Sequence, residues 1–156
     1  MALAAASLAA TACHAAREGP APLPPDVSAE PAALSGDAYA GRLLDLVNRE
    51  RARRGARPLR RTGCAERLAE RWSDRLARRG ALRHQPIRDV LHACDAIRAA
   101  ENLGAGQPTP DDLLRKWLAS SQHRKNLLNP KLTHVGLGVS RSERGSWYAV
   151  ADFVAF

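Results

Sequence analysis

Apolar residues in the first part of the chain recur at the spacing of one helix face. Between Asp37 and Arg54, the positions i, i+3, i+4 and i+7 are occupied by Ala40, Leu43, Leu44 and Val47. Gly55 then ends the pattern, and Pro58 prevents the helix from resuming. The pattern predicts an amphipathic helix that buries this stripe against the rest of a folded domain.

A second amphipathic helix is predicted from about Thr62 to a stop at Gly80. Its apolar stripe consists of Ala65, Leu68, Ala69, Trp72 and Leu76. A third helix begins in TPDDLLRKWL, where Thr109 can cap the helix and Pro110 fits its first turn. The segment between the second and third helices has little periodicity, so no element is predicted there.

A short fourth helix follows directly. Ser120 or Ser121 can cap it, it passes through His123, and Asn129-Pro130 stops it. The end of the chain then changes to a period of two. In THVGLGVS one face carries Val135, Leu137 and Val139, and the other carries His134, Gly136 and Gly138.

The last ten residues, WYAVADFVAF, are apolar on both faces and predict a buried strand. Together with the preceding strand and the turn SERGS they predict an antiparallel hairpin. Helices followed by a hairpin indicate an α+β fold, in which helices stack on a small antiparallel sheet. At 156 residues the chain is long enough for one such domain and a tail.

The chain begins with MALAAASLAATAC, an uncharged segment of small apolar residues that is too short to span a bilayer. We interpret residues 1–13 as a signal or lipoprotein leader, residues 14–36 as a Pro-rich tether and residues 37–156 as the folded domain. Cys13 would become a lipidated N-terminus if Ala10-Thr11-Ala12 is a lipobox, whereas the same residues would also serve as an Ala-x-Ala cleavage site. Both alternatives predict export: secreted, periplasmic or lipid-anchored.

Positive charge is concentrated in the first half of the domain. The formal net charge is +8, and the segment from Arg42 to Arg83 holds fourteen Arg against five acids. These arginines form either a surface that attracts anions or simply the solvated faces of two helices. No aromatic RNA-binding pattern or zinc-finger spacing accompanies them, so nucleic acid is not an expected partner.

If the protein is exported, the two cysteines of the domain can form a disulfide. Cys64 and Cys94 would meet an oxidising compartment, and the sequence therefore predicts a disulfide between the second helix and a long loop.

Four polar residues stand out as candidates for chemistry. His84 follows a helix end, Glu101 lies in the apolar segment AAENLGAG, and His123 lies at a helix start that favours a neutral ring. His134 shares its strand face only with glycines, which would let a bulky group approach it. Their spacing alone does not specify a metal site.

Several motifs in unbroken order resemble the CAP superfamily of cysteine-rich secretory, antigen 5 and pathogenesis-related 1 proteins, and its bacterial SCP-like secreted branch most of all. The motifs are LLDLVNRERARRGARPL, a His after a Gly-ended helix, AENL, KWLASSQHRKNLLNP and THVGLGV. The resemblance covers about residues 37–156. It implies an α-β-α sandwich, in agreement with the order of elements predicted above.

The resemblance also implies one cleft formed by His84, Glu101, Asn102 and His123, with His134 as a further member. In several family members two such histidines bind zinc, which implies His84 and His123 as metal ligands here. Eukaryotic relatives carry a second Glu just before the later His, and residues 113–122 of this chain contain no acid.

The leading interpretation is a monomeric binding module of the cell envelope that captures lipid or an anionic wall polymer without turnover. A metal-assisted hydrolase, with zinc on His84 and His123 and Glu101 activating water, is the alternative. A structural envelope protein with an unused cleft is a third. The absent second acid argues against an enzyme, and fold alone cannot assign a reaction.

Overall fold

The computed structural model describes residues 34–156. The predicted leader, Cys13 and most of the predicted tether lie outside the described residues. In chain order the elements are α1 (Gly36–Arg53), β1 (Arg60–Arg61), α2 (Gly63–Arg79), α3 (Ile87–Cys94), β2 (Arg98–Ala105), α4 (Pro110–Ala119), α5 (Ser121–Leu128), β3 (His134–Arg141) and β4 (Trp147–Ala155). No helix in this part of the chain combines the length and apolar character that a membrane span requires.

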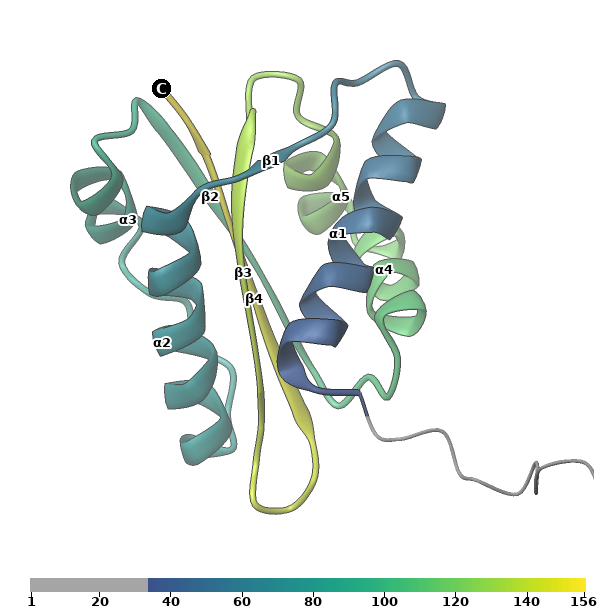
Figure 1. The fold of residues 1–156 in the computed structure, drawn as a ribbon, viewed down its shortest axis with the longest axis vertical. Helices are drawn as coiled ribbons and strands as arrows, with labels where there is room; N and C mark the ends of the chain where they lie inside the picture. Colours follow the sequence, from purple (N-terminus) through teal and green to yellow (C-terminus); the bar gives the residue numbers. More distant parts are fainter. Residues whose placement is uncertain (1–33) are drawn as a thin grey trace, which may run out of the picture. The chain divides into compact units, whose positions relative to one another are not determined.

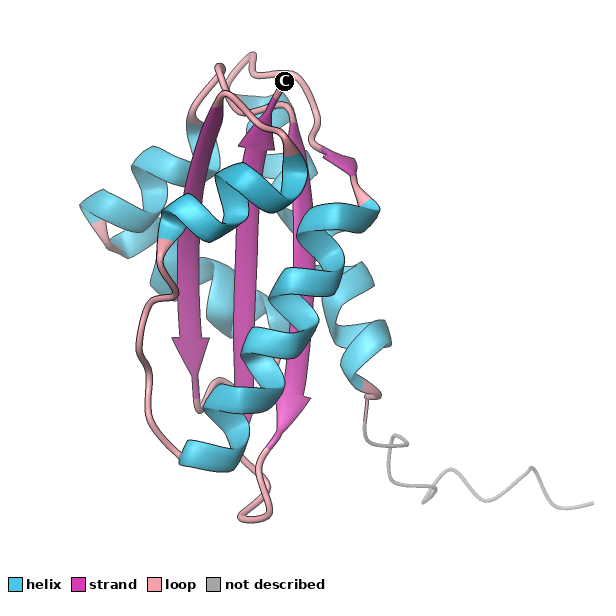
Figure 2. Ribbon diagram, turned by 90° about the vertical axis from the view of Figure 1, so that its left-hand side faces the viewer, coloured by secondary structure: helices cyan, strands magenta, loops and turns pink. Residues whose placement is uncertain are grey.

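The elements form three layers, with one sheet between two layers of helices, as Figures 1 and 2 show. The strand order is β1-β3-β4-β2; β4 pairs antiparallel with both β3 and β2, and β1 pairs parallel with β3. Helices α2 and α3 cover one face, and α1, α4 and α5 cover the other. The prediction of an α+β fold built as an α-β-α sandwich is confirmed.

The predicted helices and the hairpin lie where the sequence pattern placed them. Ser35 caps α1, Gly80 ends α2 in the left-handed conformation with φ 65°, and Ser120 caps α5. Thr109 caps α4, and Pro110 occupies the first turn of that helix. The apolar faces of α1, α4 and the hairpin meet in one core whose largest member is Trp117.

The segment between Ala81 and Pro110, for which no element was predicted, contains α3 and β2. Strand β2 consists mostly of small residues, and its inner half is buried on both faces. It therefore lacks the alternation by which a half-buried strand is recognised. The sheet thus has four strands where only the two of the hairpin were predicted.

Helix α2 packs directly on the glycines of β3. A Cβ atom at Gly136 would collide with the backbone of Ala65 and Glu66, and one at Gly138 with the backbone of Ala69. The space above these glycines was predicted to admit a bulky group near His134. That prediction is wrong, because the backbone of α2 fills the space.

The Arg-rich segment is not uniformly exposed. Arg51 was counted within it, yet only 1% of this residue is exposed. Its guanidinium donates to four backbone carbonyl oxygens, those of Arg57 (2.7 Å), Leu127 (2.6 Å), Asn129 (3.2 Å) and Leu132 (3.0 Å). Arg51 therefore joins α1 to the loop that follows it and to the end of α5 with the loop beyond. Its guanidinium is unavailable to an anionic partner.

The predicted disulfide between Cys64 and Cys94 is present, with 5.3 Å between the two Cα atoms. Cys94 ends helix α3 and does not lie in a loop. The bond therefore ties the start of α2 to the end of α3, across the segment that carries His84 and Gln85.

Removing this disulfide by the double change Cys64→Ser and Cys94→Ser is expected to cost about 2–4 kcal/mol, because it releases a loop of 30 residues in the unfolded chain. Urea unfolding of the oxidised wild type and of the double variant measures the difference. Coincident unfolding midpoints would contradict a stabilising role.

Candidate functional site

Strand β2 lies at one edge of the sheet, so groups from both helical layers can reach around it. Successive side chains of a strand point to opposite faces. Glu101 contacts the segment that follows α2, and Asn102 contacts α5. This edge is where the sequence-predicted residues meet.

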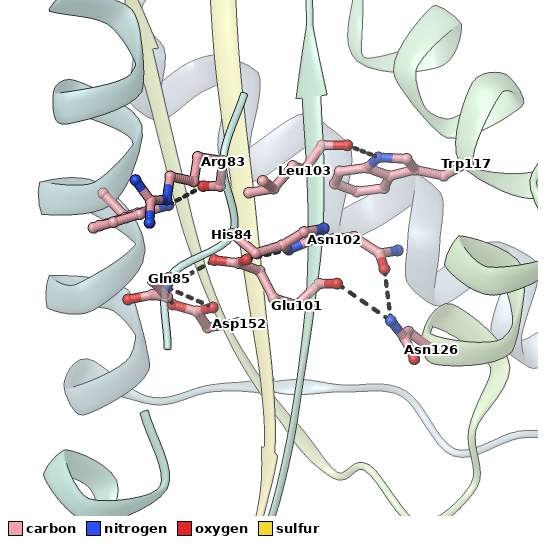
Figure 3. Close-up of polar contacts among 10 residues, drawn as sticks. Arg83, His84, Gln85, Glu101, Asn102, Leu103, Trp117, Asn126 and Asp152 are labelled. Carbon is pink, nitrogen blue, oxygen red and sulfur yellow. Dashed lines mark hydrogen bonds and ion pairs between the residues drawn. The ribbon is translucent and has the colours of Figure 1, made fainter. Parts of the chain in front are cut away.

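His84 lies exposed over a buried carboxylate (Figure 3). Its Nδ1 is bonded to Oε1 of Glu101, and the exposed fractions of the two side chains are 64% and 3%. An ionised carboxylate can only accept a hydrogen bond, so Nδ1 of His84 carries the hydrogen. This contact orients the imidazole and leaves Nε2 as the ring atom that a ligand can use.

Two further members of the site, Gln85 and Asp152, were not predicted from the sequence. Nε2 of Gln85 donates to Oε2 of Glu101 at 2.9 Å and lies 3.0 and 2.9 Å from the two carboxylate oxygens of Asp152. All three residues are buried. The one available signal was an acid in the otherwise apolar strand WYAVADFVAF, where an unpartnered charge would be costly.

On the other face, two asparagines attach α5 to β2. The side-chain nitrogen of Asn126 donates to Oδ1 of Asn102 at 2.9 Å and to the carbonyl oxygen of Glu101 at 3.2 Å. Asn102 in turn donates to the carbonyl oxygen of His123 at 3.1 Å. Asn102 was predicted as a ligand-binding residue, but it is completely buried and instead positions α5.

The imidazole of His123 is half-buried, 6.4 Å from the ring of Trp117 between centroids. Burial lowers the pKa of His123, and the charges of His84 and Lys116 lower it further. The ring is therefore neutral at pH 7. Its Nδ1 is buried without a hydrogen-bond partner.

A cleft of about 330 Å³ opens beside β2. It is lined by His84, Gln85, Ile87, Ala99, Ala100, Glu101, Gln122 and Asn126. Both oxygens of Glu101 are hydrogen-bonded, to Nδ1 of His84 and to Gln85, and only 3% of its side chain is exposed. Glu101 therefore orients His84, and its role in activating water stays a prediction.

The implied zinc site lacks a third protein ligand among the described residues. Within residues 34–156, no three His, Cys, Asp or Glu side chains are grouped so that they could hold a metal ion. Nδ1 of His84 and both oxygens of Glu101 are already engaged within the protein, and Nδ1 of His123 is buried. Zinc ligation by His84 and His123 stays a prediction, in which His84 would bind through Nε2.

His134 does not join the other candidates. It begins β3, which β4 separates from β2, and it pairs with Val154. Nδ1 of His134 lies 2.9 Å from the hydroxyl of Thr133, and its ring packs edge-on against Phe156. His84 and Glu101 therefore line the cleft, whereas His123 and His134 do not.

Comparison with known proteins gives the same fold. The family model for the cysteine-rich secretory protein (CAP) family matches residues 44–153. The uncharacterized protein YkwD of Bacillus subtilis is 32% identical over an alignment of 116 residues, which covers 69% of this chain and 45% of that protein. The chain thus spans less than half the length of this curated relative.

The solved structures that are similar include two from bacteria. An extracellular protein with an SCP domain from Bacillus anthracis has a TM-score of 0.67 and 24% identity, over 79% of this chain and 44% of that one. An outer surface protein of Borrelia burgdorferi has a TM-score of 0.72 and 16% identity, over 78% of this chain and 96% of that one. With the family model covering most of the chain, the protein belongs to the CAP family of cysteine-rich secretory proteins.

Proposed function

We propose that this chain is an exported binding module of the bacterial cell envelope, and that the cleft beside β2 binds an anionic polymer of that envelope. Export is supported by the solved relatives described as extracellular and as outer surface proteins. The observation that carries the proposal is His84, an exposed imidazole held in one orientation by buried Glu101.

The lining of the cleft favours a polar polymer over a lipid tail. Five of its eight residues have polar side chains, and a few placed polar groups are what fix the orientation of a ligand. When protonated, His84 offers its Nε2 hydrogen to a phosphate or carboxylate oxygen, a charge-assisted hydrogen bond. Lipid is therefore the second choice of ligand.

Isothermal titration with an oligomer of glycerol phosphate tests this proposal, with neutral dextran as the control polymer. His84→Ala is expected to lower affinity at least tenfold, because it removes a hydrogen bond to a charged group worth about 1.5–3 kcal/mol. His92→Ala is the matched control, since His92 is exposed on α3 and outside the cleft lining. Equal affinity of wild type and His84→Ala would contradict the proposal.

The arginines on the outer face of α2 supply long-range attraction in this proposal. Arg67, Arg71, Arg75 and Arg79 recur every four residues, and all four are exposed. Among residues 34–156 none of them has a carboxylate oxygen within 4.0 Å, although Arg75 stacks on Trp72. The four charges thus remain available to an anionic surface.

We expect binding of the glycerol phosphate oligomer to weaken steeply as salt rises, since exposed charges are screened beyond about 8 Å at physiological ionic strength. Replacing the four arginines by Gln should flatten this dependence. Titrations at several salt concentrations measure it. Unchanged salt dependence in the variant would mean that the four side chains are merely solvated.

A hydrolase is the second candidate, because an imidazole oriented by a carboxylate is also the arrangement of a general base. The described residues that line the cleft include no Ser, Thr or Cys, so no side-chain nucleophile accompanies His84. Such a reaction would use water activated by His84. New polymer ends released by wild type but not by His84→Ala would favour this candidate over binding alone.

A further inference from the structure

The carboxyl group of Asp152 is buried directly beneath the cleft. Asp152 lies on β4 opposite Glu101 in the antiparallel register, so the two side chains project from the same face of the sheet. Counted over the whole residue, the exposed fraction of Asp152 is 0% and that of Glu101 is 8%. The fold thus brings a second acid from another strand next to Glu101.

One amide nitrogen serves both carboxyl groups. Nε2 of Gln85 carries two hydrogens and has three carboxylate oxygens within 3.0 Å, one from Glu101 and two from Asp152. Figure 3 shows Gln85 between the two acids. Two buried carboxylates that share so few donors cannot both remain charged at low cost.

The groups around Asp152 decide which acid holds a proton. From β2 it faces Glu101, and from the segment after α2 it faces Gln85, beyond which lies His84. From β3 the paired residue is Gly136, and behind that glycine α2 contributes the backbone of Ala65 and Glu66. The side chain of Glu66 is turned to Arg61.

Among residues 34–156, no Lys, Arg or His forms an ion pair with Asp152, whereas Glu101 has His84. The acid without a cationic partner, Asp152, is therefore the one that holds the proton.

We infer that Asp152 is a positioning member of this site that holds a proton next to Glu101, so that the floor of the cleft carries one negative charge and not two. This inference rests on the proposed function in one respect: an anionic ligand at His84 would be repelled by a second negative charge beneath it. Loss of the proton from Asp152 should then lower the affinity of the cleft for an anionic ligand.

The direction of titration agrees with this geometry. Burial, and to a lesser degree the charge of Glu101, raise the pKa of Asp152 to about 8, although the hydrogen bond from Gln85 opposes both. Asp152 is thus protonated at neutral pH and loses its proton as pH passes about 8. Affinity for an anionic ligand should fall across that range.

Infrared spectroscopy of the full chain tests the proton directly. Wild type at pH about 7 should show the carbonyl stretch of a buried protonated carboxyl group, and this band should vanish as pH passes about 8. The band should be absent from Asp152→Asn and retained in Asp89→Asn, a change at an exposed acid on α3. A wild type without this band at neutral pH would overturn the inference, and this measurement needs no variant to fold.

The consequence for the site is tested with the glycerol phosphate oligomer. Between pH about 7 and about 9, wild type should lose affinity at least tenfold more than Asp152→Asn, whose amide cannot ionise. Equal pH dependence in the two proteins would overturn the coupling to binding. If the oligomer binds neither protein, the proposed function fails while the infrared band still decides the protonation of Asp152.

Discussion

Replacing Gly136 with alanine is expected to cost about 3 kcal/mol or more and to move α2 away from the sheet. The new Cβ would collide with the backbone of Ala65 and Glu66, and backbone atoms cannot turn aside as the end of a side chain can. Since His84 follows α2 directly, its contact with Glu101 should be lost as well. Urea unfolding with the disulfide intact measures the stability, and oligomer titration measures the site.

Gly41→Ala is the matched control for this substitution. Gly41 lies within α1, has no atom within 4 Å of the position a Cβ would take, and has an ordinary negative φ. The change should stabilise the domain by about 0.5–1 kcal/mol, because alanine favours the helix. A Gly136→Ala protein as stable as wild type would show that α2 does not pack on β3 at this distance.

Replacing Arg51 with methionine is expected to cost about 3–5 kcal/mol. Methionine fills much of the same volume, but four hydrogen bonds from the guanidinium are lost, and the buried carbonyl oxygens of Leu127 and Leu132 lose that donor. The free energy of unfolding of Arg51→Lys should lie between those of wild type and Arg51→Met, since one ammonium group cannot reach all four acceptors. The free energy of unfolding in urea measures each step.

Arg49→Met is the control, since Arg49 is exposed on the same helix and its loss should change stability by less than about 0.5 kcal/mol. If Arg51→Met lost no more than Arg49→Met, the buried hydrogen bonds would have no net stabilising value.

Local patterns were sufficient for much of the fold. The stripes of α1 and α2, the caps Thr109 and Ser120, and the alternation of β3 are each set by neighbours within a few residues. The period of α1 even continues from Val47 to Arg51, so the burial of that arginine had a signal. Arginine is rarely fully buried, so its place on an apolar stripe does not by itself predict burial.

The candidate site was only partly predictable, because its contacts join residues far apart in sequence. His84 and Glu101 were found through the family resemblance, and the structure brings them together. Asp152 and Gln85 are 67 positions apart, and Glu101 meets Asp152 only once β2 pairs with β4, a strand pairing that no local pattern predicted. His134 shares the glycine face of its strand, but α2 occupies that face.

The proposed function depends above all on Glu101 holding the ring of His84 for a ligand in the cleft. Nitrogen-15 NMR of the His84 ring, during titration with the glycerol phosphate oligomer, reports on both the ring and the ligand. We predict hydrogen on Nδ1 in the unliganded neutral ring, loss of this preference in Glu101→Gln, and a shift of the Nε2 resonance on binding, with His92 unchanged. Hydrogen on Nε2 in the unliganded wild type, with no response to the oligomer, would contradict this role of Glu101.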